Sequence, residues 1–420
     1  MAYVAVKGGE SAIEKSIELL KLSRGGGSLK LEVEAITSRM KQLTDRVMCE
    51  AGFYAPEYAA IALKQSEGSL EEAVFLTRAY RSTLPRNHVT LPLDCRDMRL
   101  VRRISSAFKD IPMGQILGAT YDYTHRLIDF GLIFEDEKEL QASNEAFIAE
   151  VTGADRENRL ADREDGLGDC KDGQADREDK LYEVKAPRVS DLLRQEGIIA
   201  SFEPDDSEPD DITRDKYMFP ASRSVRLQTL FRADTGFISG VSYAGLRGYG
   251  FSAHPTIGEL RSGYMEIEIV YPLNCDERVV LGEILFTEVE SYVSDSRSTS
   301  SGGSTSGGGS TSGNGSTSGV GSTSGGGSTS ERHDELGIAI GYGLAFGRAE
   351  TRAIAMSILD CALNHPAPGS PPNDEEFVLL HGEALEMSGF ISHLKLPHYV
   401  TYQSKLDNIR KTRREGEKRR

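Results

Sequence analysis

A tract of serine, threonine and glycine interrupts the chain and limits what the rest of it can fold into. Residues 298–330 repeat the pattern Ser-Thr-Ser-Gly-Gly-Gly with small variations. A segment of this composition behaves as a flexible coil with a root-mean-square span of roughly 30 Å. We therefore expect a spacer at about 298–331 that holds no site. The folded body must be built from the residues on either side of it.

A second stretch is also too polar to build a core. Within residues 151–186 the sequence Ala-Asp-Arg-Glu occurs at Ala154, Ala161 and Ala175. Such a segment buries too little apolar surface to offset the entropy that is lost on ordering. It is predicted to be a disordered acidic insertion.

Hydrophobic periodicity predicts the elements between these tracts. Apolar residues recur at helical intervals at 12–22, 31–51, 70–84, 123–132, 349–363, 374–387 and 397–410. Alternation and β-branched content predict strands at 237–243, 264–270, 279–289 and 338–346, whereas 98–118 is expected to be rich in loops. Helices and strands come in separate runs, which favours an α+β fold. We predict a helical N-terminal region at 1–95, a mixed-sheet core with flanking helices at 96–297, and a C-terminal part of that core at 332–420.

Composition and charge exclude several classes of function. The chain has 420 residues and a formal net charge of −16, whereas a general nucleic-acid binder needs a basic surface. No apolar run has the length of a membrane span, and the first residues lack the pattern of a signal peptide, so we expect a cytoplasmic protein. Five separated cysteines without a C-x-x-C pair indicate reduced thiols and no iron–sulfur cluster held by this chain alone. The chain ends in a basic tail at 413–420.

Two groups of basic residues have the chemistry of phosphate clamps. Guanidinium forks bind phosphate oxygens bidentately, and neighbouring glycines let the backbone approach an anion. From these groups we predict phosphate or nucleotide contacts by Arg102, Arg103, Lys109, Arg126, Arg223, Arg226, Arg247 and Arg261.

A possible acid–base group lies within the first of these basic regions. On a helix, Asp122 and His125 would be three residues apart and His125 and Asp129 four apart, so all three would share one face. That face would supply a general acid or base. The alternative is a network of surface salt bridges, because Arg126 and Asp129 are also spaced as helical partners.

His393 and His398 lie five residues apart across Pro397. This interval fits neither one face of a helix nor one face of a strand, so only a turn brings the two rings together. The proline favours such a turn. Neutral imidazoles suit zinc, but the spacing alone favours a purely structural role.

Several motifs, in order along the chain, carry a family resemblance. They are Arg102-Arg103-Ile104-Ser105, Lys109-Asp110-Ile111-Pro112, Thr120-Tyr121-Asp122-Tyr123-Thr124-His125-Arg126, Pro209-Asp210-Asp211-Ile212-Thr213-Arg214, Gly341-Tyr342-Gly343-Leu344 and Ser392-His393-Leu394-Lys395-Leu396-Pro397-His398-Tyr399. Together they resemble PhnI, a subunit family of the bacterial carbon–phosphorus lyase core complex, over nearly the whole chain outside the two insertions. Met113 departs from the family's pattern, which suggests a glycine at that position.

The resemblance implies a role in phosphonate catabolism. With its partner subunits, the family exchanges the purine base of ATP or GTP for an alkylphosphonate at the anomeric carbon of the ribose. The product is a ribose 1-alkylphosphonate 5-triphosphate, and a protein of this kind alone is expected to act as a purine-nucleotide nucleosidase. The family also shares a zinc ion with its radical-chemistry subunit, through the two histidines that match His393 and His398. The iron–sulfur cluster and the S-adenosylmethionine chemistry belong to that partner.

Two other interpretations remain open. The chain is either a non-catalytic assembly subunit that supplies half of an interfacial zinc site, or a free-standing zinc hydrolase. The second of these requires a third zinc ligand within this chain.

Overall fold

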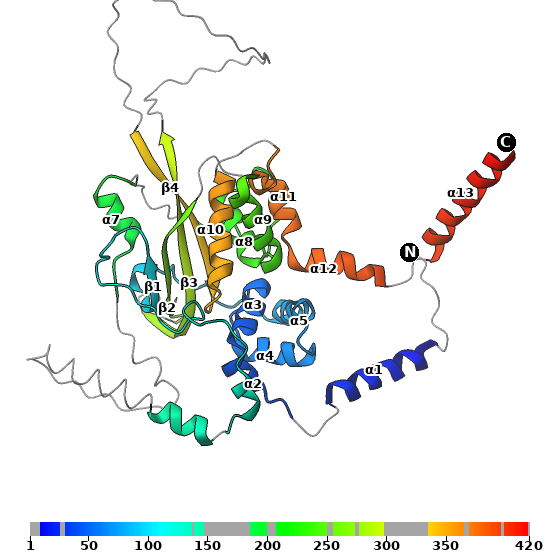
Figure 1. Ribbon diagram of the computed structural model, residues 1–420, viewed down its shortest axis with the longest axis horizontal. Coiled ribbons are helices and arrows are strands. Elements are labelled where there is room, and N and C mark those ends of the chain that lie inside the picture. The colour runs from blue at the N-terminus through cyan, green and yellow to red at the C-terminus, as the bar shows by residue number, and fades with distance from the viewer. Residues whose placement is uncertain are drawn as a thin grey trace, which may run out of the picture.

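The structure is a computed structural model, and it describes residues 9–25, 30–136, 138–146, 185–199, 207–249, 255–273, 277–297, 335–364, 369–395 and 399–418. Its body consists of a β-sheet, a group of helices packed on one face of that sheet, and a separate group of N-terminal helices (Figure 1). The predicted spacer at 298–331 lies outside the described residues. So does the acidic insertion at 151–186, except for its last two residues.

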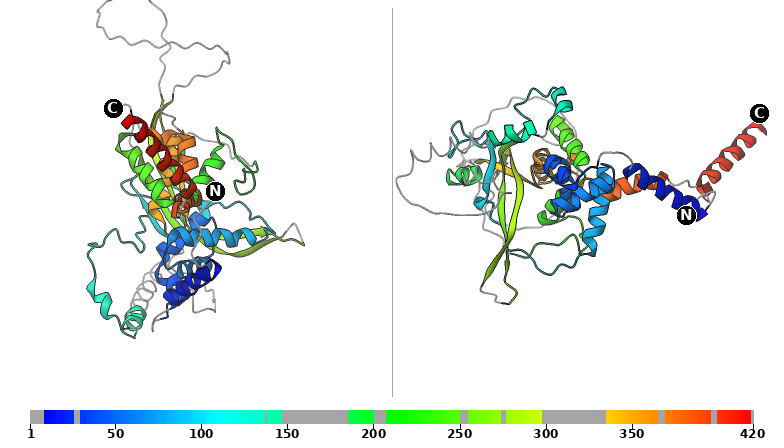
Figure 2. Two further views of the ribbon diagram at one scale, coloured as in Figure 1. Left: turned by 90° about the vertical axis from the view of Figure 1, so that its right-hand side faces the viewer. Right: turned by 90° about the horizontal axis from the view of Figure 1, so that it is seen from below.

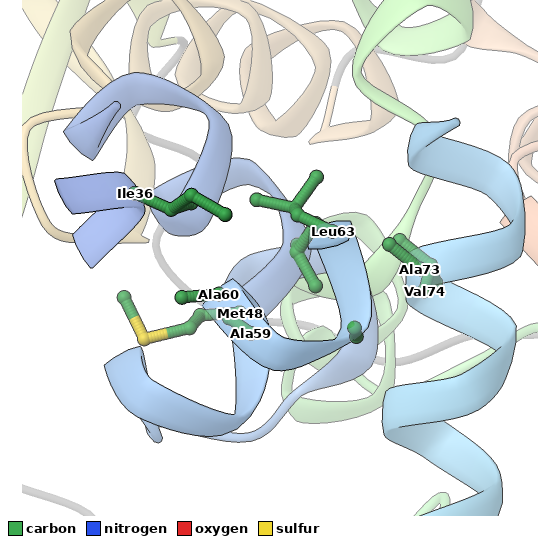
Figure 3. Packing of buried hydrophobic residues seen from close by; sticks show 9 residues of the cluster. Ile36, Met48, Ala59, Ala60, Leu63, Ala73 and Val74 are labelled. Atoms are coloured by element: carbon green, nitrogen blue, oxygen red, sulfur yellow. The ribbon is translucent and has the colours of Figure 1, made fainter. Parts of the chain in front are cut away.

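Four short helices form the N-terminal group. They are α2 (Val33–Arg39), α3 (Lys41–Ala51), α4 (Pro56–Gln65) and α5 (Leu70–Thr83). Their buried side chains, among them Ile36, Met48 and Leu63, make one apolar cluster (Figure 3). The helix predicted over 31–51 breaks at Met40, so it is two helices. Helix α3 ends at Gly52, whose φ of 60° gives the left-handed C-cap for which glycine is best suited.

The sheet has four strands in the order β1-β2-β3-β4, and every neighbouring pair is antiparallel. The strands are β1 (Arg99–Ser105), β2 (Thr256–Val270), β3 (Arg278–Arg297) and β4 (Glu335–Phe346). The predicted α+β class is confirmed, but the sheet is antiparallel throughout rather than mixed. The part of β3 from Phe286 to Arg297 pairs with the whole of β4, and the pairing ends at Arg297 and Glu335. Residues 298–334 therefore connect the two strands of a hairpin.

Side chains alternate along each strand and give the sheet two different buried faces. On β3, Val289 packs in an apolar cluster with Ala353 of α10 (Glu350–Asn364). Glu288 and Glu290 point to the opposite face, where Arg188 pairs with both carboxylates just before α7 (Val189–Gln195). Both glutamates are buried, at 2% and 6% exposed. One face is therefore a conventional apolar core, and the other is a buried layer of charges.

Strand β4 lies close against α10 because glycines occupy alternate positions. A Cβ atom on Gly341 would lie 2.1 Å from the carbonyl oxygen of Ser357, and one on Gly343 would lie 1.9 Å from that of Ala353. Two positions on one face of the strand thus meet two positions one helical turn apart on α10. The intervening Tyr342 points to the charged face, where its hydroxyl donates to Glu288 at 3.1 Å. Glycines of the Gly-Tyr-Gly motif therefore serve helix–sheet packing.

Two elements differ in type from the sequence prediction. Residues 237–243, predicted as a strand, belong to helix α9 (Thr235–Ala244), which Asp234 caps by accepting from the N–H of Phe237 at 2.6 Å. Packing on α10 fixes this helix, because the hydroxyl of Ser242 donates to the carbonyl of Ala355 at 2.8 Å. Conversely, the region 98–118 contains strand β1. Its arginines hide the apolar alternation that normally reveals a strand.

Further helices occur in the described part of the chain. They are α1 (Gly9–Gly25), α8 (Arg223–Arg232), α11 (Glu375–His381), α12 (Ala384–Ser392) and α13 (Tyr399–Lys418). The helix predicted over 374–387 is therefore two helices, and the final predicted helix is confirmed. Helices α1, α12 and α13 extend away from the body in Figure 1 and in the right-hand view of Figure 2. Among the described residues, no helix is long and apolar enough to cross a membrane.

Met113 occupies the position of a turn that demands a positive φ. The N–H of Gly114 donates to the carbonyl of Ile111 at 2.9 Å, Pro112 fills the second position, and Met113 has a φ of 66°. These features match a type II turn, whose third residue is normally glycine. The turn forms despite the methionine, at the cost of local strain.

Met113→Gly is expected to stabilise the protein by about 1 kcal/mol. A left-handed non-glycine residue costs about 1–2 kcal/mol, and the extra freedom of glycine in the unfolded chain offsets part of the gain. Urea denaturation of both proteins measures the difference. Met218→Gly is the matched control, because Met218 is exposed and has no positive φ, so only destabilisation is expected there. A loss of stability in Met113→Gly would contradict the strain argument.

Candidate functional site

Arg102 gathers the acidic groups of the candidate site. It lies on β1 and is 4% exposed. Its Nη2 donates to Asp122 at 2.7 Å, its Nε pairs with Glu350 at 2.9 Å, and its Nη1 donates to the carbonyl oxygen of Leu117. Gly118 permits this close approach, because a Cβ atom there would lie 3.1 Å from the Cβ of Arg102. Two carboxyl groups from distant parts of the chain thus share one buried cation.

The two carboxyl groups lie in different environments. Glu350 opens α10 with its side chain 21% exposed, and burial raises its pKa. Arg102 opposes this rise in the pKa of Glu350, and the charge of Asp122 adds to it. The Asp122 side chain is 47% exposed and also pairs with Arg126 at 3.2 Å. A carboxyl group with a raised pKa beside a solvated carboxylate is the arrangement that enzymes use for chemistry at a glycosidic carbon.

The segment around Asp122 is not the helix that the spacing predicts. Thr124 donates its N–H to the carbonyl of Tyr121 at 3.1 Å, which closes a turn, and no helix is present between residues 120 and 129. Asp122, His125 and Asp129 therefore do not share a helical face, and that prediction is wrong. The ion pair of Asp122 with Arg102 holds the segment in its observed course.

His125 and Asp129 lie further along the same surface segment, and both are exposed. Asp129 caps the 3₁₀ helix Phe130–Phe134 by accepting from the N–H of Gly131 at 2.9 Å. Large apolar side chains around them are unusually exposed, each by at least 61%; they are Tyr121, Tyr123, Leu127, Ile128, Phe130, Leu132, Ile133 and Phe134. A contiguous apolar stretch of this kind marks an interaction surface.

Two of the predicted phosphate ligands lie in the buried charged layer instead. Arg103 is 0% exposed and Arg261 is 1% exposed. The Nε of Arg103 donates to Glu259 at 2.7 Å, and its two Nη atoms donate to the carbonyls of Pro112 and Pro187. Arg261 pairs with Glu288 at 3.4 Å. In this arrangement both guanidiniums hold strands and the α7 segment together.

Two further predicted ligands lie on α8, facing α10. Arg223 pairs with the fully buried Asp360 at 2.6 Å, and Arg226 donates to Asn364 at 2.9 Å. The Arg223 side chain is 49% exposed, so part of its guanidinium can still meet a ligand. The structure does not bring these two arginines to the cluster around Arg102.

The last members of the predicted basic set lie on the surface. Lys109, Arg126 and Arg247 are exposed, and Arg126 joins the Arg102 cluster through Asp122. Of the predicted site residues that the structure describes, Arg102, Asp122 and Arg126 are the ones that meet in the cluster around Arg102. The basic set is divided among several places in the fold.

His393 and His398 are only partly covered by the structure. His393 follows α12, stacks edge-on against Phe390, and its Nδ1 contacts the carbonyl oxygen of Phe390. Because a carbonyl only accepts, this contact places the proton of the ring on Nδ1. His398 lies outside the described residues. Within the described ranges, no three acidic, histidine or cysteine side chains form a metal cluster.

Glu350 is the site residue that sequence reasoning missed. Acidic residues are common in the first turn of a helix, where they interact with the helix dipole. The position of Glu350 at the start of α10 is therefore explained without any function. Only the three-dimensional contact with Arg102 distinguishes it, and no local sequence signal reveals that contact.

Comparison with known proteins supports one family. The family model described as "Bacterial phosphonate metabolism protein (PhnI)" matches residues 2–323 and 320–416. The chain is 40% identical to the Escherichia coli (strain K12) protein "Alpha-D-ribose 1-methylphosphonate 5-triphosphate synthase subunit PhnI", over 98% of this chain and 99% of the other. It is 37% identical to the Stutzerimonas stutzeri "Putative C-P lyase subunit protein HtxH", over 98% and 96%. A model match over almost the whole chain and full-length relatives at this identity establish that the chain belongs to the PhnI family.

Proposed function

We propose that the chain is the subunit of the carbon–phosphorus lyase pathway that replaces the purine of ATP or GTP with an alkylphosphonate. The product is a ribose 1-alkylphosphonate 5-triphosphate, and water replaces the phosphonate when the chain acts alone. One observation carries the proposal: Arg102 holds two unlike carboxyl groups, Asp122 and Glu350, as glycosidic chemistry requires. Since the substrate is a cytoplasmic nucleotide, the protein acts in the cytoplasm.

In this mechanism Glu350 is the general acid. It gives its proton to the purine as the bond between the anomeric carbon and the base nitrogen breaks, and the bonding electron pair leaves with the base. Asp122, which pairs with Arg102, stabilises the positive charge that develops on the ribose. An oxygen of the phosphonate then bonds to the anomeric carbon. Arg126 is the exposed cation next to Asp122 and is placed to contact the phosphates.

The proposal also includes a zinc ion shared with a partner subunit. His393, through Nε2, and His398 would supply two ligands, and the radical-chemistry subunit would complete the site. The Nδ1 contact of His393 fits this role. When bound, zinc would stabilise the interface and polarise a coordinated oxygen.

Substitution of the two carboxyl groups tests the proposal. Glu350→Gln and Asp122→Asn are each expected to lower the rate of adenine release from ATP at least 10²-fold, the usual loss for a general acid or base. Released adenine is measured by chromatography, for the isolated chain and for the assembled complex. Glu376→Gln is the matched control: it removes an exposed glutamate from the first turn of α11 and should leave the rate unchanged.

The pH profile gives an independent readout. A group with a raised pKa stays protonated to higher pH, so activity that needs the Glu350 proton is lost as the pH rises through that pKa. The groups that set this pKa are Arg102, Asp122 and Arg348. Glu350→Gln should remove this alkaline limb. If Glu350→Gln still lost activity over the same alkaline pH range, the general acid would be another residue.

The alternative is a non-catalytic assembly subunit. The exposed apolar side chains between Tyr121 and Phe134 favour it, because they suit burial against another protein. Full turnover by a complex that contains both Glu350→Gln and Asp122→Asn would place the chemistry in a partner subunit.

A further inference from the structure

The structure contains a second cluster of arginines, away from Arg102, in which Arg81 and Arg232 have no described carboxylate within ion-pair distance. It lies where α3, α5 and α8 end, and α8 lies above α3 and α5 in Figure 1. Arg81 on α5 and the last residue of α8, Arg232, both come close to Gly52: a Cβ there would lie 2.9 Å from Nη1 of Arg81 and 3.2 Å from Cδ of Arg232. Arg78, one turn before Arg81, donates to the carbonyl of Arg232 at 3.1 Å.

Other buried arginines of the described chain are each matched by a carboxylate. The five that are less than 10% exposed, each with an acidic partner, are Arg78 with Glu383, Arg102 with Asp122 and Glu350, Arg103 with Glu259, Arg261 with Glu288, and Arg352 with Glu50. Arg81 and Arg232 are partly buried, and no described carboxylate lies within ion-pair distance of either. The buried Nε of Arg232 also has no hydrogen-bond acceptor among the described residues.

The nearby acidic residues do not form ion pairs with Arg81 or Arg232. Glu383 is committed to Arg78 and to the N–H groups that open α12. Asp211, in the Asp-Asp-Ile-Thr-Arg motif, is held by Arg86 and by the N–H of Thr213 at 2.9 Å. Its charge reaches Arg81 and Arg232 only from outside contact distance.

Burial and the neighbouring positive charges lower the pKa of both Arg81 and Arg232. Burial, followed by the charges of Arg78 and Arg81, lowers the pKa of Arg232 to about 10. Burial, Arg78 and Arg86 lower the pKa of Arg81 in the same way. The Nη1 of Arg81 donates hydrogen bonds to the carbonyls of Ala51 and Gly52 at the end of α3, at 2.8 and 3.0 Å. Arg232 has no such compensation in the described structure.

We infer that Arg81 and Arg232 form a binding site for a phosphate or phosphonate dianion. Two guanidinium forks match the oxygens of one tetrahedral anion, and its charge near −2 neutralises both cations. Chloride or a single carboxylate would neutralise only one. The site lies at the Gly52 end of α3, whereas Arg348 and the neighbouring Glu350 lie at its Asp45 end, since Asp45 accepts from the N–H of Arg348 at 2.9 Å. It does not depend on the proposed function.

Thermal unfolding of the full-length protein tests this site. Inorganic phosphate at ten times its dissociation constant should raise the midpoint by about 2 °C relative to chloride of equal ionic strength. Arg232→Met should abolish this rise. In phosphate-free buffer the same variant should be at least as stable as the parent protein, because it removes an uncompensated cation. A residue that serves only packing would give the opposite result.

Two further variants sharpen the test. Arg232→Lys keeps the charge but not the fork, so it should retain only part of the phosphate effect. Arg410→Met, on the exposed face of α13, should respond to phosphate as the parent protein does. Equal effects of phosphate on the parent protein and on Arg232→Met would overturn the inference. A failure of Arg232→Met to fold would also count against it.

Comparison of anions identifies the source of the phosphoryl group. Tripolyphosphate binding at least tenfold more tightly than phosphate would indicate the tail of a nucleotide. Equal binding of phosphate and methylphosphonate, without a gain for tripolyphosphate, would indicate a single free oxyanion. If none of the three anions stabilised the protein more than chloride does, Arg81 and Arg232 would not form an anion-binding site.

Discussion

Arg103→Met is expected to lower the free energy of unfolding by about 3–5 kcal/mol, the usual cost of breaking a buried ion pair from one side. Arg103 is fully buried, and its guanidinium donates to Glu259 and to two backbone carbonyls. Among the described residues, the variant leaves the buried Glu259 with only the N–H of Val189 as a donor, at 2.8 Å. Two carbonyl groups also lose their donor. Urea denaturation measures the loss.

Two companion variants define what the loss means. Lys185→Met removes an exposed ion pair with Asp97, 3.5 Å long, and should change stability by less than about 1 kcal/mol. Adding Glu259→Gln to Arg103→Met should recover part of the loss, because the unpaired charge is then gone. If Arg103→Met retained full stability but bound nucleotide more weakly, Arg103 would be a ligand contact after all.

Gly343→Ala is expected to destabilise the protein by about 3 kcal/mol or more, at the upper end of the costs of overpacking. The added Cβ would lie 1.9 Å from the carbonyl oxygen of Ala353 and 2.8 Å from the nitrogen of Ser357. Both are backbone atoms of α10, so no side-chain rotation relieves the clash. Strand and helix must separate, which opens the apolar core between them.

The control for this substitution is a glycine that has open space around it. Gly389 lies in α12, and a Cβ atom there would meet no described atom within 4 Å, so Gly389→Ala should be neutral or stabilise by up to about 1 kcal/mol. The free energies of unfolding of both variants are compared with that of the parent protein. Parent-like stability in Gly343→Ala would show that α10 yields easily, against the packing described above.

Local patterns predicted the elements whose buried faces are apolar. Strands β2, β3 and β4 and helices α5 and α10 follow ordinary hydrophobic periodicity, and the α+β class follows from their order. Strand β1 was missed because charged side chains occupy two of its buried positions. Glu259 of β2 pairs with Arg103, whereas Asp122 and Glu350 pair with Arg102. Helix α9 was assigned as a strand because its β-branched and aromatic residues suit either state, and tertiary packing decided between them.

The candidate site was harder to predict than the fold. The sequence placed Asp122 and Arg102 in one region, and the structure joins them by an ion pair. The helical spacing that linked Asp122 to His125 and Asp129 was wrong, because a long-range contact with β1 overrides the local pattern. Glu350 is separated from Arg102 by most of the chain, so no spacing rule connects them. Arg103 and Arg261 have the same residue type as a phosphate ligand, and only burial reveals their structural contacts.

The β3–β4 hairpin has a consequence for how this chain tolerates change in length. Arg297 and Glu335 pair side by side, so the connection between them begins and ends at one point of the body. Each doubling of a flexible connection costs only about 0.6 kcal/mol in closure entropy. This position can therefore gain or lose residues during evolution, or accept a fused reporter domain, while the register of the strands and the cluster around Arg102 stay in place.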